Sequence, residues 1–174
     1  MAHKIYIGID NGITGTIGWV GDAVETGFIE TPKFSEQSYT KKKGNISRIK
    51  HLVLKQKFID VLGSTNPSDV LVILERPLVN PGKFKASISG VRALEATLCV
   101  IEDLGFPRMY ADSKDWQKVL LPKGTKGSDE LKKASLDIGC RLFPQFTDVI
   151  TDHGDADGIL ITEWARRAGL WDSV

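Results

Sequence analysis

Short apolar runs alternate with turn residues over the first part of the chain. Residues 5–9 are apolar and lead into Asp10, and a second apolar run over residues 16–20 follows a glycine-containing turn. Gly21-Asp22 predicts the next turn, before a third run over residues 23–29. These runs predict a meander of three antiparallel strands that holds Asp10 rigidly at the end of the first strand.

The pattern changes twice over the next segment. Residues 31–47 lack apolar periodicity and include a basic run beside Gly44, so we expect a solvated loop there. From Ile46 to Leu62 apolar residues recur at helical spacing, and the turn-forming stretch 63–67 ends the run. This periodicity predicts a helix that crosses over the sheet.

The middle of the chain contains the most continuous apolar run. Val70–Leu74 predicts a strand covered on both faces, and this strand ends at Glu75. Ser89–Leu104 carries an apolar stripe at helical spacing, and Arg108–Ala111 predicts another short strand. Trp116 follows among apolar neighbours, so we expect its side chain to pack inward.

Two further helices complete the predicted elements. One has Ser128 as its N-cap and is closed by Pro144, and the last runs roughly from His153 to Ala168. This order describes an α/β fold with a mixed sheet, an antiparallel meander plus parallel strands, flanked by helices. At 174 residues the chain has the usual size of one domain.

Composition limits the classes of protein and of partner. The 23 Lys and Arg residues nearly balance the 22 Asp and Glu residues, so a nucleic-acid partner would need a local basic patch. Cys99 and Cys140 lie in predicted amphipathic helices, so we expect buried free thiols and neither a disulfide framework nor a zinc site. No leader pattern and no run of about 18 apolar residues occurs, so we expect a soluble, cytoplasmic protein.

Acidic residues lie at the ends of several predicted elements. Asp10 follows the first strand, Glu75 follows the buried strand, and Asp152, Asp155 and Asp157 surround the start of the last helix. Carboxylates that converge repel one another unless a divalent cation neutralises them. Two magnesium ions about 4 Å apart, held by such a set, would activate a water and stabilise the leaving oxygen in phosphodiester cleavage.

Most of these acids also have a purely structural interpretation. Asp10 before glycines is a common turn former, and Glu75 has Arg76 beside it as an ion-pair partner. Asp152 and Asp155 suit helix caps that complement the helix dipole. The sequence leaves these readings open for each residue taken alone.

The first turn of the last helix offers competing ligands. Asp157 lies too far into the predicted helix to be a cap, and His153, four residues earlier, would share its face. Asp155 would point elsewhere unless the helix begins late. We therefore rank Asp157 first, with Asp155, His153 and Asp152 as alternatives for the fourth ligand.

Several motifs in this chain resemble a known family. G-I-D-N-G-I-T-G at the first strand, L-E-R-P after the buried strand and H-G-D-A-D-G-I-L-I at the last helix resemble the RuvC-type Holliday junction resolvases, within the ribonuclease H-like nuclease superfamily. N-P-G-K-F-K-A-S, R-A-L-E-A-T and S-K-D-W-Q-K-V-L-L-P-K-G are similar to the compact RuvC-like nucleases encoded by phages. The similarity spans nearly the whole chain.

The resemblance implies one ribonuclease H-like nuclease domain over residues 1–174. It implies an endonuclease that resolves Holliday junctions or other branched DNA by two-metal hydrolysis and leaves 5′-phosphate products. Asp10 and Glu75 would bind Mg²⁺ or Mn²⁺, two ions per site, with acids of the last helix. It also implies a homodimer paired through the helix Ser89–Leu104.

One position departs from the family pattern. In RuvC proteins the penultimate ligand lies three residues before the final aspartate, and here Gly154 stands three residues before Asp157. Pairing Asp152 with Asp155 restores the spacing but leaves Asp157 unexplained. The resemblance therefore leaves the fourth ligand open.

Basic residues are expected to flank the acidic site and to grip DNA phosphates in a salt-dependent manner. These DNA-binding candidates are Lys41, Lys42, Lys43, Lys83, Lys85, Lys123 and Lys126, with Lys132, Lys133, Arg166 and Arg167 nearby. Phe84 lies between two of these lysines, and RuvC-like enzymes use a loop aromatic to stack on a disrupted base pair.

Three other functions compete with a junction resolvase. A less selective nuclease that debranches or degrades DNA would carry the same motifs. An actin-like nucleotide-binding domain would also use a glycine-rich hairpin after an aspartate, but it predicts a longer chain with a second hairpin repeat, which is not found. A DNA-binding module without catalysis is disfavoured by the intact set of acids.

Overall fold

The computed structural model describes residues 4–38 and 44–173. The strands are β1 (Ile5–Ile9), β2 (Thr16–Gly21), β3 (Val24–Glu30), β4 (Lys33–Gln37), β5 (Asn45–Ile49), β6 (Val70–Glu75) and β7 (Arg108–Ala111). The helices are α1 (His51–Leu62), α2 (Phe84–Asp103), α3 (Ser113–Leu120), α4 (Ser128–Leu142), α5 (Thr147–His153) and α6 (Asp157–Ala168). Short single-turn helices occupy Pro67–Asp69, Pro81–Lys83, Pro144–Phe146 and Leu170–Ser173.

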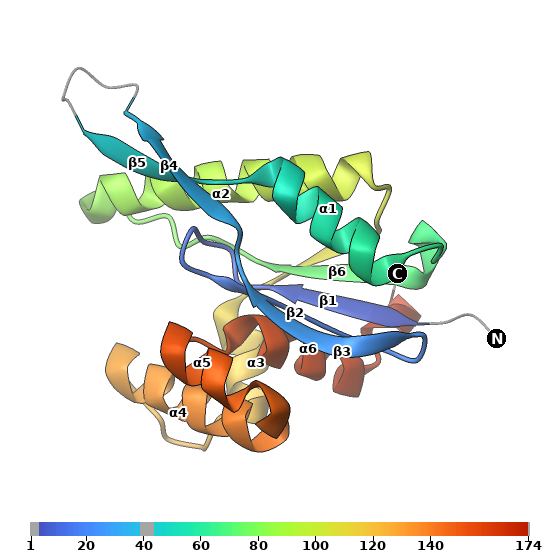
Figure 1. Cartoon of the computed structure of the whole chain (residues 1–174). Helices are drawn as coiled ribbons and strands as arrows, with labels where there is room; N and C mark the ends of the chain where they lie inside the picture. Colours follow the sequence, from blue (N-terminus) through green and yellow to red (C-terminus); the bar gives the residue numbers. More distant parts are fainter. Residues whose placement is uncertain (1–3, 39–43, 174) are drawn as a thin grey trace.

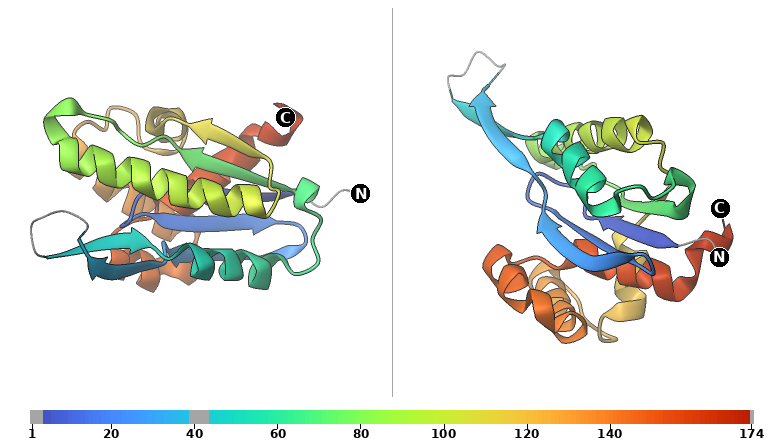
Figure 2. Two further views of the ribbon diagram at one scale, coloured as in Figure 1. Left: turned by 90° about the horizontal axis from the view of Figure 1, so that it is seen from above. Right: turned by 45° about the vertical axis from the view of Figure 1, so that its right-hand side comes forward.

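A five-stranded mixed sheet in the order β3-β2-β1-β6-β7 forms the centre of the molecule (Figure 1). β1 pairs antiparallel with β2, and β2 with β3, as the meander predicted. β6 pairs in parallel with both β1 and β7. Helices α1 and α2 cover one face of the sheet and α3 to α6 lie on the other (Figures 1 and 2). The fold class expected from the sequence is therefore confirmed.

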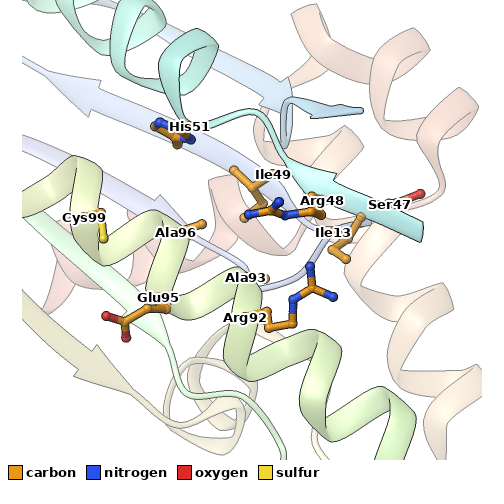
Figure 3. Close-up of a pocket in the computed structure, with 10 residues that line it drawn as sticks. All are labelled: Ile13, Ser47, Arg48, Ile49, His51, Arg92, Ala93, Glu95, Ala96 and Cys99. Atoms are coloured by element: carbon orange, nitrogen blue, oxygen red, sulfur yellow. The ribbon is translucent and has the colours of Figure 1, made fainter. Parts of the chain in front are cut away.

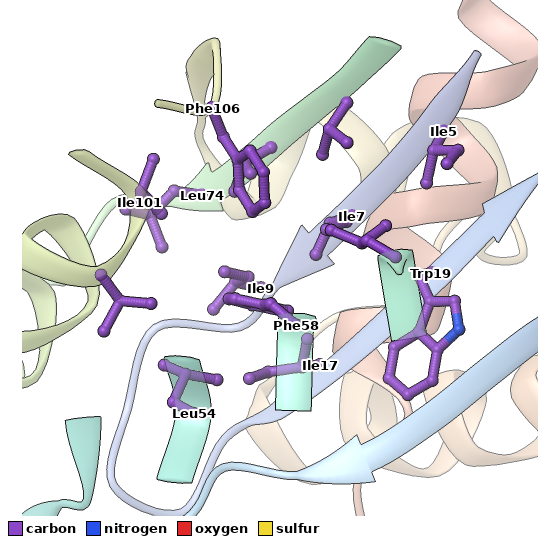
Figure 4. Close-up of a cluster of buried hydrophobic side chains, with 14 of the residues drawn as sticks. Ile5, Ile7, Ile9, Ile17, Trp19, Leu54, Phe58, Leu74, Ile101 and Phe106 are labelled. Atoms are coloured by element: carbon purple, nitrogen blue, oxygen red, sulfur yellow. The ribbon is translucent and has the colours of Figure 1, made fainter. Parts of the chain in front are cut away.

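Alternation along β1 divides the core into two layers. Ile5, Ile7 and Ile9 point into a cluster with Leu54 and Phe58 of α1, shown in Figure 4. Tyr6 lies on the opposite face, in a second cluster formed mainly by the later helices. Because successive side chains of a strand point to opposite faces, one short apolar strand serves both layers.

The segment 31–47 is not the loop that its polarity suggested. β4 and β5 form an antiparallel hairpin that stands out from the body of the molecule (Figure 1). All residues of its two strands except Ile49 are exposed or part-buried, and Arg48 pairs across the hairpin with Glu36 at 2.6 Å. Because the hairpin buries so little area, its strands lack the apolar pattern of a core strand, and the sequence did not predict them. Lys41, Lys42 and Lys43 lie outside the described residues.

Three predicted helix boundaries are wrong. α1 begins at His51, because the residues from Asn45 to Ile49 are in β5. α2 begins five residues early, at Phe84, after a single-turn helix opened by Pro81, whose fixed φ suits a helix start. Ser128 is the first residue of α4 and not its N-cap, which is Gly127 with φ of 87°.

An unpredicted helix, α3, carries Trp116 at 0% exposure, so its expected inward packing is confirmed. The two cysteines differ from expectation, because Cys99 is exposed and Cys140 is half-buried, and both are free thiols. Among the described residues, no helix is long and apolar enough to cross a membrane.

The last predicted helix is two helices. α5 ends at His153, Gly154 adopts the left-handed conformation with φ of 72°, and α6 starts at Asp157. His153 and Asp157 therefore do not share one helical face, and Asp157 occupies the first turn of α6. The glycine supplies the positive φ that breaks the run.

Candidate metal centre

Three carboxylates from two distant parts of the chain meet at the end of β1. Asp10 begins the turn after β1, while Asp155 and Asp157 lie at the junction between α5 and α6. Oxygens of these three side chains all lie within 4.8 Å of one another. The sequence-predicted Asp10, Asp155 and Asp157 are thus brought together, so two of the three candidate aspartates around the start of the last helix belong to the cluster.

Glycines allow α6 to approach the sheet closely enough for this meeting. A Cβ atom at Gly158 would overlap the backbone of Thr16 in β2, and one at Gly8 would overlap the backbone of Gly158 and Thr162. The Thr162 hydroxyl fills part of this contact, accepting a hydrogen bond from the Gly8 amide at 2.8 Å. Backbone contact between helix and strands fixes the first turn of α6 against the end of β1.

Thr16 joins the two halves of the cluster. Its backbone carbonyl accepts a hydrogen bond from the Asp10 amide at 3.0 Å. Its hydroxyl donates to Oδ1 of Asp155 at 2.9 Å and accepts from the Gly158 amide at 3.0 Å. Asp155 Oδ1 also accepts from the Asp157 amide at 2.7 Å, which leaves its other oxygen for a ligand. Thr16 is fully buried, so this arrangement is held away from water.

Glu75 lies beside the cluster on the neighbouring strand. Ile9 of β1 pairs with Leu74 of β6, so the next residue of each strand, Asp10 and Glu75, are adjacent and their side chains hydrogen bond. The indole Nε1–H of Trp116 donates to Glu75 Oε1 at 3.1 Å. The alternative partner, Arg76, instead pairs with Asp112 at 3.0 Å.

Burial and the neighbouring charges make three of these acids, Asp10, Glu75 and Asp157, hard to ionise. Burial, followed by the charges of Asp155, Glu75 and Asp157, raises the pKa of Asp10 well above its ordinary value. Burial likewise raises the pKa of Glu75, against the opposing effect of its hydrogen bonds. Burial and the Asp155 charge raise the pKa of Asp157 to about 7, although hydrogen bonding to Ser135 and the charge of Lys132 oppose the rise.

The donor set fits a hard divalent cation. All the converging groups are carboxylate oxygens, which Mg²⁺ and Mn²⁺ prefer. Asn11, next to Asp10, has a buried Oδ1 with no hydrogen-bond partner among the residues described, although its Nδ2 donates to the Gly90 carbonyl at 3.2 Å. A bound cation would remove the repulsion that raises these pKa values.

His153 and Asp152 do not join the cluster. His153 Nε2 lies 2.9 Å from the Thr14 carbonyl and Nδ1 lies 3.2 Å from Glu30, so the ring connects α5 to the turn after β1 and to the end of β3. Asp152 is exposed on α5. The group of acids that could hold a metal, as found among the described residues, includes neither side chain.

The predicted DNA-binding residues within the described chain are on the surface. Lys83, Lys85, Lys123 and Lys126 are exposed, and Phe84 is 70% exposed in the first turn of α2. A cleft beside the cluster is lined by Ser128, Lys132, Asp155 and Asp157, among others. Lys126 precedes Ser128 by two residues, so the loop before α4 reaches the rim of this cleft.

Sequence reasoning missed the residues that orient the acids. Thr16 was read only as part of a strand, Ser135 only as part of a helix, and Trp116 only as a core residue. A hydroxyl in an apolar strand is the one signal that could have identified Thr16, because a buried hydroxyl needs a hydrogen-bond partner.

Replacing Thr16 by valine is expected to weaken metal binding. Valine keeps the shape of threonine but leaves Asp155 Oδ1 and the Gly158 amide each without one hydrogen bond. Loss of such an orienting contact typically costs about 10–100-fold in metal affinity. Calorimetric titration of the folded variant with Mn²⁺ measures the loss. Thr16→Ser retains the hydroxyl and should bind Mn²⁺ nearly as the native protein does; equal affinity of the valine and serine variants would rule out the orienting role.

Comparison with known proteins shows a similarity in fold and none in sequence. No family model matches the sequence, and no curated protein matches it. The solved structure of T. thermophilus RuvC in complex with Holliday junction substrate superposes with a TM-score of 0.54 at 14% identity, covering 95% of this chain and 96% of that chain. A second Thermus thermophilus RuvC structure gives a TM-score of 0.48 at 15% identity, covering 95% and 96%. The first comparison confirms the ribonuclease H-like fold expected from the motifs.

Proposed function

We propose that this protein is a metal-dependent, structure-specific DNA endonuclease that cuts branched DNA, with the four-way Holliday junction as its substrate. The observation that carries the proposal is the meeting of Asp10, Asp155 and Asp157 within 4.8 Å, next to Glu75. Support also comes from the similar fold of T. thermophilus RuvC, which has been solved with Holliday junction substrate.

Four acids are proposed to hold Mg²⁺ or Mn²⁺. Asp10, Asp155 and Asp157 are the proposed ligands, with Glu75 as the fourth carboxylate on the adjoining strand. When bound, the metal would polarise the scissile phosphate and supply a nucleophilic water. The chain itself orients the ligands: Thr16 holds Asp155, Ser135 holds Asp157, and Trp116 holds Glu75.

Four exposed lysines are proposed to hold the DNA backbone. Lys83 and Lys85 flank Phe84 at the start of α2, and Lys123 and Lys126 lie in the loop before α4. With a net charge of +1 the chain as a whole attracts DNA little, so these local groups must provide the attraction. Binding should therefore weaken steeply as salt concentration rises.

We also propose a homodimer that presents two metal centres to opposed strands of the junction. The side of α2 that carries Ile88 and Val91 has apolar side chains that are 38% and 43% exposed. Such a stripe at helical spacing suits pairing with a second copy of the same helix. A solution mass equal to one chain at working concentrations would remove this part of the proposal.

Junction selectivity is tested by incubating the protein with a labelled four-way junction and with linear duplexes of the same four sequences. In Mg²⁺ the junction is expected to be cut at paired positions on opposed strands, at least about tenfold faster than the duplexes. No cleavage is expected in EDTA. Equal cleavage of junction and duplex would indicate a less selective DNA-degrading nuclease, the nearest alternative.

A further inference from the structure

A second cavity, away from the acidic cleft, opens between strand β5, helix α2 and the turn that follows β1. Its volume is about 360 Å³. Ile13, Ile49, Ala93 and Ala96 give it mainly apolar walls, and Arg48 and Arg92 supply its cationic groups (Figure 3). Nothing in the metal centre described above uses this cavity.

The size and the walls suit a single nucleotide. Pockets for small ligands begin at about 300 Å³, so the cavity can take a base with its sugar and phosphate. Aliphatic walls from two directions, Ile13 and Ile49 on one side and the alanines of α2 on the other, offer contact to the flat faces of a base. Such contacts tolerate any base, because every base has a flat apolar face.

The charges suit the phosphate of that nucleotide. Arg92 points from α2 toward Ile13, on the side from which Arg48 enters, whereas the carboxylate of Glu95 is directed away from both (Figure 3). Arg48 is paired with Glu36 through one guanidinium nitrogen and is about half exposed, so further N–H groups remain for an anion. Guanidinium groups bind phosphate well, through paired hydrogen bonds.

The cavity is connected to the metal centre through a short turn. Ile13 lies three residues after Asp10, and Asn11 fastens this turn to α2 through its hydrogen bond to the Gly90 carbonyl at 3.2 Å. A nucleotide placed against Ile13 would therefore touch the same turn that presents the central carboxylate.

We propose that this cavity binds one unpaired nucleotide of the DNA substrate, with the base between Ile13, Ile49 and the α2 alanines and the phosphate on Arg48 and Arg92. The proposal rests on the proposed function, because branched DNA offers bases that are already unstacked, for which the energetic cost of leaving the helix is least. Seating such a base beside the turn of Asp10 would select branched over linear DNA.

Binding of single nucleotides to the full chain in EDTA tests the cavity without any cleavage. The four deoxynucleoside monophosphates and inorganic phosphate are titrated separately and followed by NMR. Saturable binding of the nucleotides is expected at a Kd on the order of 1 mM, with inorganic phosphate binding at least tenfold more weakly. Ala96→Phe, which fills the cavity, and Arg92→Gln should each weaken nucleotide binding at least tenfold.

Ala86→Phe is the matched control, because it adds the same bulk to an exposed position of α2 outside the cavity and should bind nucleotides normally. Absence of saturable nucleotide binding, or equal binding by the folded Ala96→Phe variant, would overturn the proposal. Phosphate binding as tight as the nucleotides would also overturn it, since only an anion site would remain. Junction cleavage without nucleotide binding would refute the cavity alone; nucleotide binding without cleavage of any DNA would refute the nuclease assignment alone.

Discussion

Asp10→Asn is expected to lower the rate of junction cleavage at least about 1,000-fold, which corresponds to roughly 4 kcal/mol of lost transition-state stabilisation. Asparagine has nearly the same shape, so the strand, the turn and the hydrogen bond to the Thr16 carbonyl should remain. What disappears is the negative charge at the centre of the acid cluster, on which metal binding depends. Initial rates in saturating Mg²⁺ measure the effect.

Asp152→Asn provides the matched control for this prediction. Asp152 is three residues from Asp155 but is exposed on α5, outside the cluster. Its substitution should leave the rate within about twofold of the native protein, as expected for a surface position. Cleavage by Asp10→Asn within tenfold of native, or an equal loss in both variants, would exclude the proposed role of Asp10.

Without metal, the protein is expected to lose stability relative to Asp157→Asn as the pH rises from about 4 to 7. The pKa of Asp157 is about 7 in the folded chain, against an ordinary value of 3.8. The folded state therefore holds a proton that the unfolded state releases, and stability falls as pH rises through this interval. A shift of this size is worth a few kcal/mol, or roughly 5–10 °C in Tm for a chain of this length.

Thermal unfolding in EDTA at several pH values measures this difference between the native protein and Asp157→Asn. Adding Mg²⁺ should raise the Tm of the native protein more at pH 8 than at pH 5, because the metal binds the ionised carboxylates. The variant should gain much less. A native Tm that runs parallel to that of Asp157→Asn across the whole range would mean that Asp157 ionises without penalty.

The sequence predicted the central strands well, because their signal is strong. The apolar runs of β1 and β6 each end at an acid, and parallel pairing of these strands was enough to place Asp10 beside Glu75. The β4–β5 hairpin escaped prediction because its strands bury little surface and carry polar residues on both faces. Helix α3 was missed because its apolar residues were read only as core neighbours of Trp116.

The sequence predicted which acids form the candidate site, but it did not predict how the segment around them is folded. The end of the helix at Gly154 could not be predicted, because H-G-D-A-D-G is equally compatible with the first turn of one continuous helix. That single positive φ moves His153 out of the cluster and brings both Asp155 and Asp157 into it. Thr16 could not be found by periodicity, because its role depends on a contact between residues 139 positions apart.

Anomalous diffraction from crystals soaked in Mn²⁺ tests the central claim most directly, because it locates the metal without reference to any activity. We predict strong anomalous density within bonding distance of Asp10, Asp155 and Asp157, on the side of the cluster that faces Glu75. Soaked crystals that show no density there, or that show Mn²⁺ bound only elsewhere, would contradict the account.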